Sequence, residues 1–76
     1  MRDEEIVELL KKDNDEFRRL YQEHRELDNQ LTELSRKHYL TPEEEVEEKR
    51  IKKEKLHRKD RIAEMIREYR KQASPS

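Results

Sequence analysis

Apolar residues between positions 17 and 38 recur at alternating steps of three and four. The stripe consists of Phe17, Leu20, His24, Leu27, Leu31, Leu34 and His38, so one histidine interrupts it and another ends it. Because about 3.5 residues nearly complete a helical turn, side chains at this spacing lie along one side of a helix. The stripe predicts a long helix over about residues 14–38, with a face that needs a partner to shield it from water.

A strong helix start follows at Thr41. Thr41 suits the N-cap position, Pro42 suits the first helical position, where its missing N–H costs nothing, and Glu44 completes a capping box with Thr41. These residues predict a short turn at 39–41 and a second long helix over about residues 42–71. The apolar face of this helix consists of Ile51, Ile62, Met65, Ile66 and Tyr69, and Leu56 lies on one flank of this face.

The first residues predict a short helix over 3–12, with an apolar face of Ile6, Val7, Leu9 and Leu10. Asp13, three residues before Glu16, forms a second capping-box pattern and predicts a new helix start near residue 14. Ile6 and Leu10, however, keep the heptad phase of the stripe, as one continuous helix would require. We favour a break. The predicted division is a short, movable N-terminal helix (1–12), the main domain (13–72) and a disordered tail (73–76).

A turn of three residues forces two long helices to run antiparallel. The sequence therefore predicts an all-α fold, an antiparallel two-helix hairpin with a short N-terminal helical segment. A single core this small rarely supplies more than about 3–5 kcal/mol. Because a hairpin covers only the facing part of each stripe, we expect hairpins to pair into a four-helix bundle. The expected oligomer is most simply a homodimer.

Composition narrows the class of protein without identifying a function. Charged residues make up 51% of the chain and hydrophobic ones 29%, which would suit a disordered protein. The net charge of −1 and the periodic apolar residues favour long helices instead. The chain has no cysteine, no apolar stretch after Met1 and no apolar run of the roughly 18 residues that a membrane span needs. We expect a soluble cytoplasmic protein without a membrane partner.

Folding the chain about residue 40 brings charged residues of both helices together near the middle of the hairpin. The expected polar layer consists of Glu23, His24, Asp28, Lys55 and Arg58. We expect Glu23 or Asp28 to form an ion pair across the helices. His24 would suit a metal ligand or a pH switch, but we favour a structural polar residue that fixes register. Because His38 and His57 lie far along the helices, a four-ligand zinc site is not expected.

The start of the second long helix is sharply divided by charge. Five of the six residues at 43–48 are glutamates, and eight of the thirteen at 49–61 are lysine or arginine. A basic stretch of this kind can neutralise phosphates, and the candidate nucleic-acid contacts are Lys49, Arg50, Lys52, Lys53, Lys59 and Arg61. The acidic neighbour, the near-neutral chain and the absence of an aromatic stacking platform argue against this interpretation. Nucleic-acid binding is therefore the alternative function.

Catalytic chemistry has little support in the sequence. The chain lacks a cysteine nucleophile, and its serines stand at the hairpin tip (Ser35) and in the tail (Ser74 and Ser76). A two-helix protein without long loops has no predicted cleft for a substrate. We expect no enzyme activity, no catalytic residue, no metal and no cofactor. The favoured function is a self-associating interaction or adaptor protein, and the apolar N-terminal segment would either dock on an unidentified protein or cap its own bundle.

Two segments carry a family resemblance: His24-Arg25-Glu26-Leu27-Asp28, and Lys52-Lys53-Glu54-Lys55-Leu56 with Lys59-Asp60 after it. They resemble the YdcH-like family of small bacterial proteins, in which a phenylalanine precedes H-x-x-L-D and K-K-x-K-L-x-L-K-D. The resemblance covers about residues 17–65. It implies an antiparallel helical hairpin and supplies no reaction, substrate or catalytic residue. Arg58 stands where the family usually has a second leucine, which implies a more polar centre.

Overall fold

All regular structure in the described part of the chain, residues 2–73 of the computed structural model, is helical. The three helices are α1 (Asp3–Asp13), α2 (Asp15–Ser35) and α3 (Pro42–Ala73). Residues 2–73 contain no strand. The prediction of an all-helical chain is therefore confirmed.

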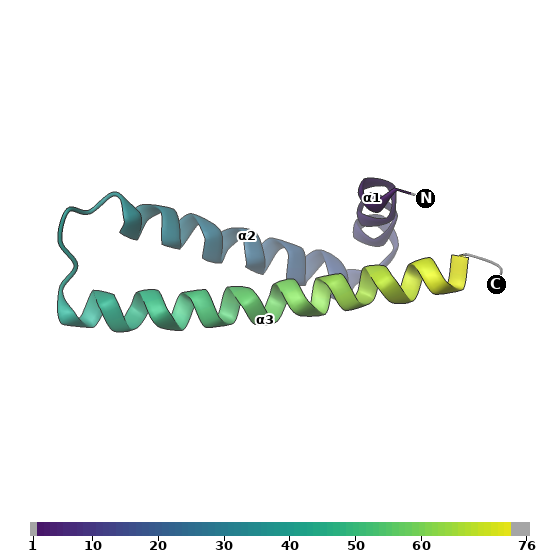
Figure 1. The fold of residues 1–76 in the computed structure, drawn as a ribbon. Helices are drawn as coiled ribbons and strands as arrows, with labels where there is room; N and C mark the ends of the chain where they lie inside the picture. Colours follow the sequence, from purple (N-terminus) through teal and green to yellow (C-terminus); the bar gives the residue numbers. More distant parts are fainter. Residues whose placement is uncertain (1, 74–76) are drawn as a thin grey trace.

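The two long helices lie side by side and run in opposite directions (Figure 1). Residues 36–41 connect them at one end of the molecule, and α1 turns across the other end, beside the last turns of α3 (Figure 1). The shape is elongated, with extents of 52 × 19 × 19 Å. We call residues 27–51 the turn end, and residues 3–21 together with 61–73 the open end.

A single residue, Asn14, separates α1 from α2. Its backbone is extended, with φ −129° and ψ 109°. The Asn14 side-chain oxygen accepts a hydrogen bond from the backbone N–H of Phe17 at 3.0 Å, which makes Asn14 the N-cap of α2. The expected capping role of Asp13 is therefore wrong, because Asp13 is still the last residue of α1.

The connection between the long helices is longer than predicted. Helix α2 ends at Ser35 rather than near residue 38, because its last turn tightens. The backbone N–H of Arg36 donates to the Glu33 carbonyl at 3.3 Å, and that of Lys37 donates to the Leu34 carbonyl at 3.2 Å. The connection is therefore 36–41 instead of 39–41, and His38 is exposed outside the helix.

The start of α3 follows the predicted capping box. Thr41 Oγ1 accepts from the Glu44 backbone N–H at 3.1 Å, and the Glu44 carboxylate accepts from the Thr41 backbone N–H at 3.0 Å. Helix α3 continues to Ala73, beyond the predicted end at residue 71. Of the tail predicted at 73–76, Ala73 is therefore helical, and residues 74–76 lie outside the described residues.

The hydrophobic core is concentrated at the open end. Its buried cluster consists of Ile6, Leu10, Phe17 and Met65, with Val7, Leu20, Tyr21, Ile62, Ile66 and Tyr69 packed around it. Helix α1 supplies half of the buried members, so it caps its own chain in this structure. At the turn end, the buried hydrophobic residues are Leu27 and Ile51.

Candidate interaction surface

The side of α3 that packs on α2 follows a regular heptad spacing. Its covered positions are Glu44, Glu48, Ile51, Lys55, Arg58, Ile62, Met65 and Tyr69, all buried or partly buried. We call this row the α3 seam. The seam is apolar from Ile62 onwards, whereas charged residues dominate its first half. Sequence reasoning placed Lys55 and Arg58 on this face but missed Glu44 and Glu48, which the same spacing continued back from Ile51 would have found.

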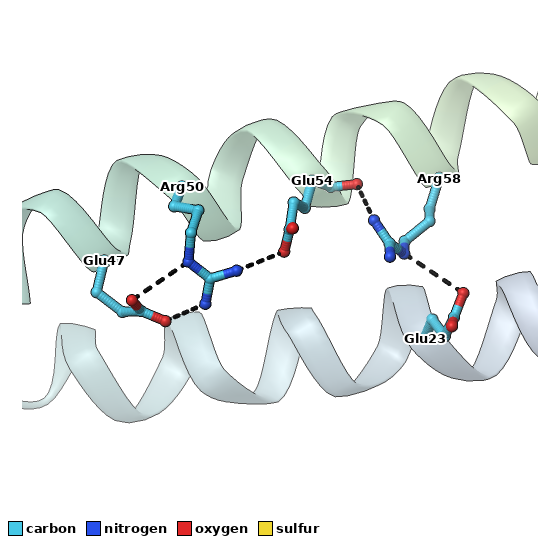
Figure 2. A network of polar contacts seen from close by, with 5 residues as sticks. All are labelled: Glu23, Glu47, Arg50, Glu54 and Arg58. Atoms are coloured by element: carbon cyan, nitrogen blue, oxygen red, sulfur yellow. Dashed lines mark hydrogen bonds and ion pairs between the residues drawn. The ribbon is translucent and has the colours of Figure 1, made fainter.

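The polar layer predicted from the sequence comes together near the middle of the two helices. Lys55 Nζ lies 2.5 Å from Asp28 Oδ1, and Arg58 Nε lies 3.5 Å from Glu23 Oε1. Figure 2 shows Arg58 reaching from α3 to Glu23 on α2 while it also donates to the Glu54 carbonyl at 3.3 Å. The layer therefore pairs each acidic group of α2 with a cation of α3.

Two nitrogens in this layer are buried without a hydrogen-bond partner in the described structure, His24 Nε2 and Arg58 Nε. The contact of Arg58 Nε with Glu23 Oε1, at 3.5 Å, is an ion pair but is too long for a good hydrogen bond. Burial lowers the pKa of His24, and the positive charge of Lys55 lowers it further, although Asp28 opposes this. The layer therefore favours the neutral imidazole of His24 over its charged form.

Asp28 is held ionised in the same layer, because the hydrogen bond from Lys55 lowers the pKa of its carboxyl group. The layer thus places two ion pairs, Asp28 with Lys55 and Glu23 with Arg58, beside His24. Within residues 2–73, no group of three histidine, cysteine, aspartate or glutamate residues is placed to hold a metal ion.

Most of the basic stretch is neutralised within the chain. The ion pairs are Arg50 with Glu47 and Glu54, Lys52 with Glu48, Lys55 with Asp28, Arg58 with Glu23, and Arg61 with Glu16 and Glu64. Among the described residues, Lys49, Lys53 and Lys59 have no such partner. The candidate nucleic-acid surface therefore shrinks from six side chains to three.

The two flanks of the α3 seam differ. At about 3.6 residues per turn, Glu47, Arg50, Glu54 and Arg61 fall on one side of the seam, and all four form ion pairs. Figure 2 shows the pairs of Arg50 with Glu47 and Glu54. We call this side the ion-paired flank. The opposite side, the Leu56 flank, consists of Lys52, Leu56, Lys59 and Ala63. It is the apolar side chain of Leu56 that stands out there, because 54% of its surface is exposed.

The structure places most of the predicted stripe residues in the interface. Buried members are Phe17, Leu27, Ile51 and Met65, and partly buried members are Leu20, His24, Leu31, Leu34, Ile62, Ile66 and Tyr69. Leu56, predicted on the flank of the α3 face, and His38, at the end of the α2 stripe, are exposed. Leu56 is exposed because it lies one helical step off the seam, where α2 does not reach it.

Comparison with known proteins adds a family but no activity. A family model described as "Protein of unknown function (DUF465)" matches residues 17–66. No curated protein and no solved structure matches the chain. Among residues 2–73, none of the helices combines the length and the apolar character that crossing a membrane requires.

Proposed function

We propose that this chain, which belongs to the DUF465 family of proteins of unknown function, acts as a self-associating helical interaction protein without catalytic activity. We also propose that this family is the YdcH-like group. The matched residues, 17–66, almost coincide with residues 17–65, which carry the resemblance.

The observation that carries the proposal is the mismatch between the two helices at the turn end. Leu31 and Leu34 on α2 are only partly buried. Between Glu44 and Lys55, Ile51 is the one apolar member of the α3 seam, and its other members there are charged. Leucine surface left in water costs about 25 cal/mol per Å². A second element with apolar side chains would remove this cost.

We propose a second copy of the chain as that element, packed on the Leu56 flank so that two hairpins form a four-helix bundle. The ion-paired flank is already covered by charged side chains, so the Leu56 flank is the side left for association. Charge favours an antiparallel pairing of two α3 helices centred near residue 51. Residues 43–48 of one copy, with five glutamates, would then lie beside the basic residues 53–59 of the other.

Light scattering over a range of micromolar concentrations tests this proposal. We expect the unmodified chain to form a dimer. Leu56→Glu should weaken association about tenfold or more, because burying one leucine side chain contributes about 1.5–3 kcal/mol.

Tyr39→Glu is the control. Tyr39 is a large hydrophobic residue with 90% of its surface exposed, and it lies in the connection 36–41, outside the paired segments of α3. We expect it to leave the dimer intact. A folded monomer at all these concentrations would contradict the proposal, and so would equal losses of association in the two variants.

Nucleic-acid binding is the second candidate, favoured only by Lys49, Lys53 and Lys59, which lack partners in the described structure. Replacing all three by glutamine should abolish a salt-sensitive gel shift with DNA or RNA, since affinity of this kind depends on phosphate neutralisation. Binding that the triple variant retains, or binding insensitive to salt, would contradict this function.

A further inference from the structure

Helix α1 is docked firmly but attached by a single residue. Its Ile6 is 0% exposed in the cluster with Phe17 and Met65, and Asp3 forms an ion pair with Arg70 near the end of α3. All of α1 lies outside residues 17–66, the region that the family model matches. The element that buries Phe17 is therefore an addition to the matched region, joined to it through Asn14 alone.

Backbone hydrogen bonds on both sides of Asn14 are already helical. Its N–H donates to the Leu10 carbonyl at 2.8 Å, and its carbonyl accepts from the Arg18 N–H at 3.1 Å. At the break itself, the Asn14 side chain accepts from the Phe17 N–H, and the Arg18 guanidinium donates to the Lys11 carbonyl at 3.2 Å. If Asn14 adopted helical dihedral angles, residues 3–35 would form one helix and Phe17 would donate to the Asp13 carbonyl instead.

The apolar pattern fits this straight helix as well as it fits the bent one. Ile6 and Leu10 are four residues apart, and Phe17 follows seven residues after Leu10, so the heptad phase continues through the break. Straightening would carry the apolar face of α1 away from Met65 and leave both faces uncovered. The contact surface between α1 and α3 is also open to solvent next to Asn14, where Leu10, Asn14, Met65 and Tyr69 line a surface hollow.

We infer that the open end is a docking site for the α1 helix of a second copy, and that two chains exchange α1 by straightening at Asn14. Each α1 then covers the Phe17 and Met65 cluster of the other chain, with the same contacts that it makes within one chain. Short connections favour exchange of this kind, because they let the same interface form between chains. The site lies at the opposite end from the turn end, so it goes beyond the association proposed above.

Crosslinking of introduced thiols tests the exchange, because the natural chain has no cysteine. One preparation carries Asp3→Cys and another carries Arg70→Cys, two positions joined by an ion pair in the structure. The preparations are unfolded, mixed, refolded together at high concentration and treated with a short bis-maleimide. We expect a covalent heterodimer of Asp3→Cys with Arg70→Cys chains, identified by intact mass.

The matched control uses Glu16→Cys and Arg61→Cys, which lie 3.0 Å apart as an ion pair at the same end but join α2 to α3. Exchange of α1 alone leaves this pair within one chain, so no heterodimer is expected from the mixed control. A chain with both Asp3→Cys and Arg70→Cys shows that the fold forms, through a crosslink within the monomer at low concentration.

The inference would be overturned if both mixtures gave heterodimers. It would also be overturned if the mixture of Asp3→Cys and Arg70→Cys chains gave no heterodimer. If the second result accompanies a dimer that Leu56→Glu disrupts, the proposed function stands and the exchange alone fails. Hinge variants add a second test, because alanine favours a continuous helix over glycine by about fivefold per residue. Asn14→Ala should raise the heterodimer fraction severalfold over Asn14→Gly, and equal fractions would overturn the hinge at Asn14.

Discussion

The open end and the turn end are built from the same two long helices, yet they differ in how completely their apolar side chains are buried. At the open end, the α3 seam offers Ile62, Met65 and Tyr69, and α1 closes the third side of the cluster. At the turn end, the seam consists of Glu44, Glu48 and Ile51, and none of the helices within residues 2–73 closes a third side. A two-helix contact with charged seam positions leaves its leucines half covered.

This difference divides the molecule by role. The buried cluster with Phe17 stabilises the fold, because the removal of apolar surface from water is the main favourable free-energy term in folding. The partly covered Leu31 and Leu34 contribute less within one chain and have more to gain from a partner. Substitutions at the two ends should therefore differ in size and in what they change.

The largest effect is expected for Phe17→Ala at the open end. Phe17 is 0% exposed, and removing a buried phenylalanine ring costs about 3–5 kcal/mol. That loss matches the whole stability of a core this small, so urea denaturation should lose its cooperative transition. Leu34→Ala at the turn end should cost about 1 kcal/mol at the same protein concentration. Equal losses would remove the distinction between the ends.

Arg58→Leu should make the middle of the molecule resemble the open end. It removes a buried nitrogen without a hydrogen-bond partner and places an apolar side chain on the α3 seam. Replacing a partly buried ion pair by apolar packing is often neutral or stabilising, and we expect a gain of about 1–2 kcal/mol in the free energy of unfolding. Glu23→Gln breaks the same ion pair without filling the layer, so it should give no gain. A loss of stability in Arg58→Leu would show that the ion pair matters more than packing.

Removing the helix caps compares the ends again on a smaller scale. Asn14→Ala removes the side-chain acceptor for the Phe17 N–H and should lower the free energy of unfolding by about 1 kcal/mol. Thr41→Ala at the turn end should cost about 0.5 kcal/mol, because the helix start there carries little buried surface. Thermal unfolding of both variants measures the difference, and a larger loss for Thr41→Ala would reverse the comparison.

The sequence was sufficient for features set by local rules. The heptad stripe on α2, the break after α1 and the box of Thr41 with Glu44 all depend on residues within one or two helical turns. Tertiary context decided the rest. The choice between Asp13 and Asn14 as cap depends on where α1 must stop to cover Phe17. The inclusion of Glu44 and Glu48 in the α3 seam depends on the register of α3 against α2. The hydrophobic pattern cannot predict this register, because the segment around these residues is charged.

Acid should affect the polar layer in two steps. The pKa of His24 is lowered in the folded chain by burial and by Lys55, so the unfolded chain binds this proton more tightly. Stability should therefore fall as pH drops below the ordinary histidine value of 6.5. The lowered pKa of Asp28 contributes stability above its ordinary value of 3.8 that is lost at lower pH.

Chemical denaturation from pH 8 to pH 5, repeated with His24→Leu, isolates the first step, because the pKa of Asp28 is lowered from 3.8 and its carboxyl group does not titrate in that range. We expect the slope of unfolding free energy against pH to flatten in the variant. An unchanged slope would assign the pH dependence to other groups.

The smallest effects concern the ion pairs that join α2 to α3 near the middle of the molecule. A double-mutant cycle on Glu23 and Arg58 should give a favourable coupling of about 0.2–1 kcal/mol, because both side chains are partly exposed and water screens the pair. A cycle on Asp28 and Lys55 should give a coupling that disappears in high salt, since solvent and ions reach Asp28 freely. These pairs align α2 with α3 without holding them together, so the apolar cluster at the open end must supply most of the stability. Zero coupling in both cycles would mean that the leucines alone determine the register of the long helices. A coupling well above 1 kcal/mol for Glu23 and Arg58 would mean that a large share of the stability comes from the middle of the molecule rather than from the open end.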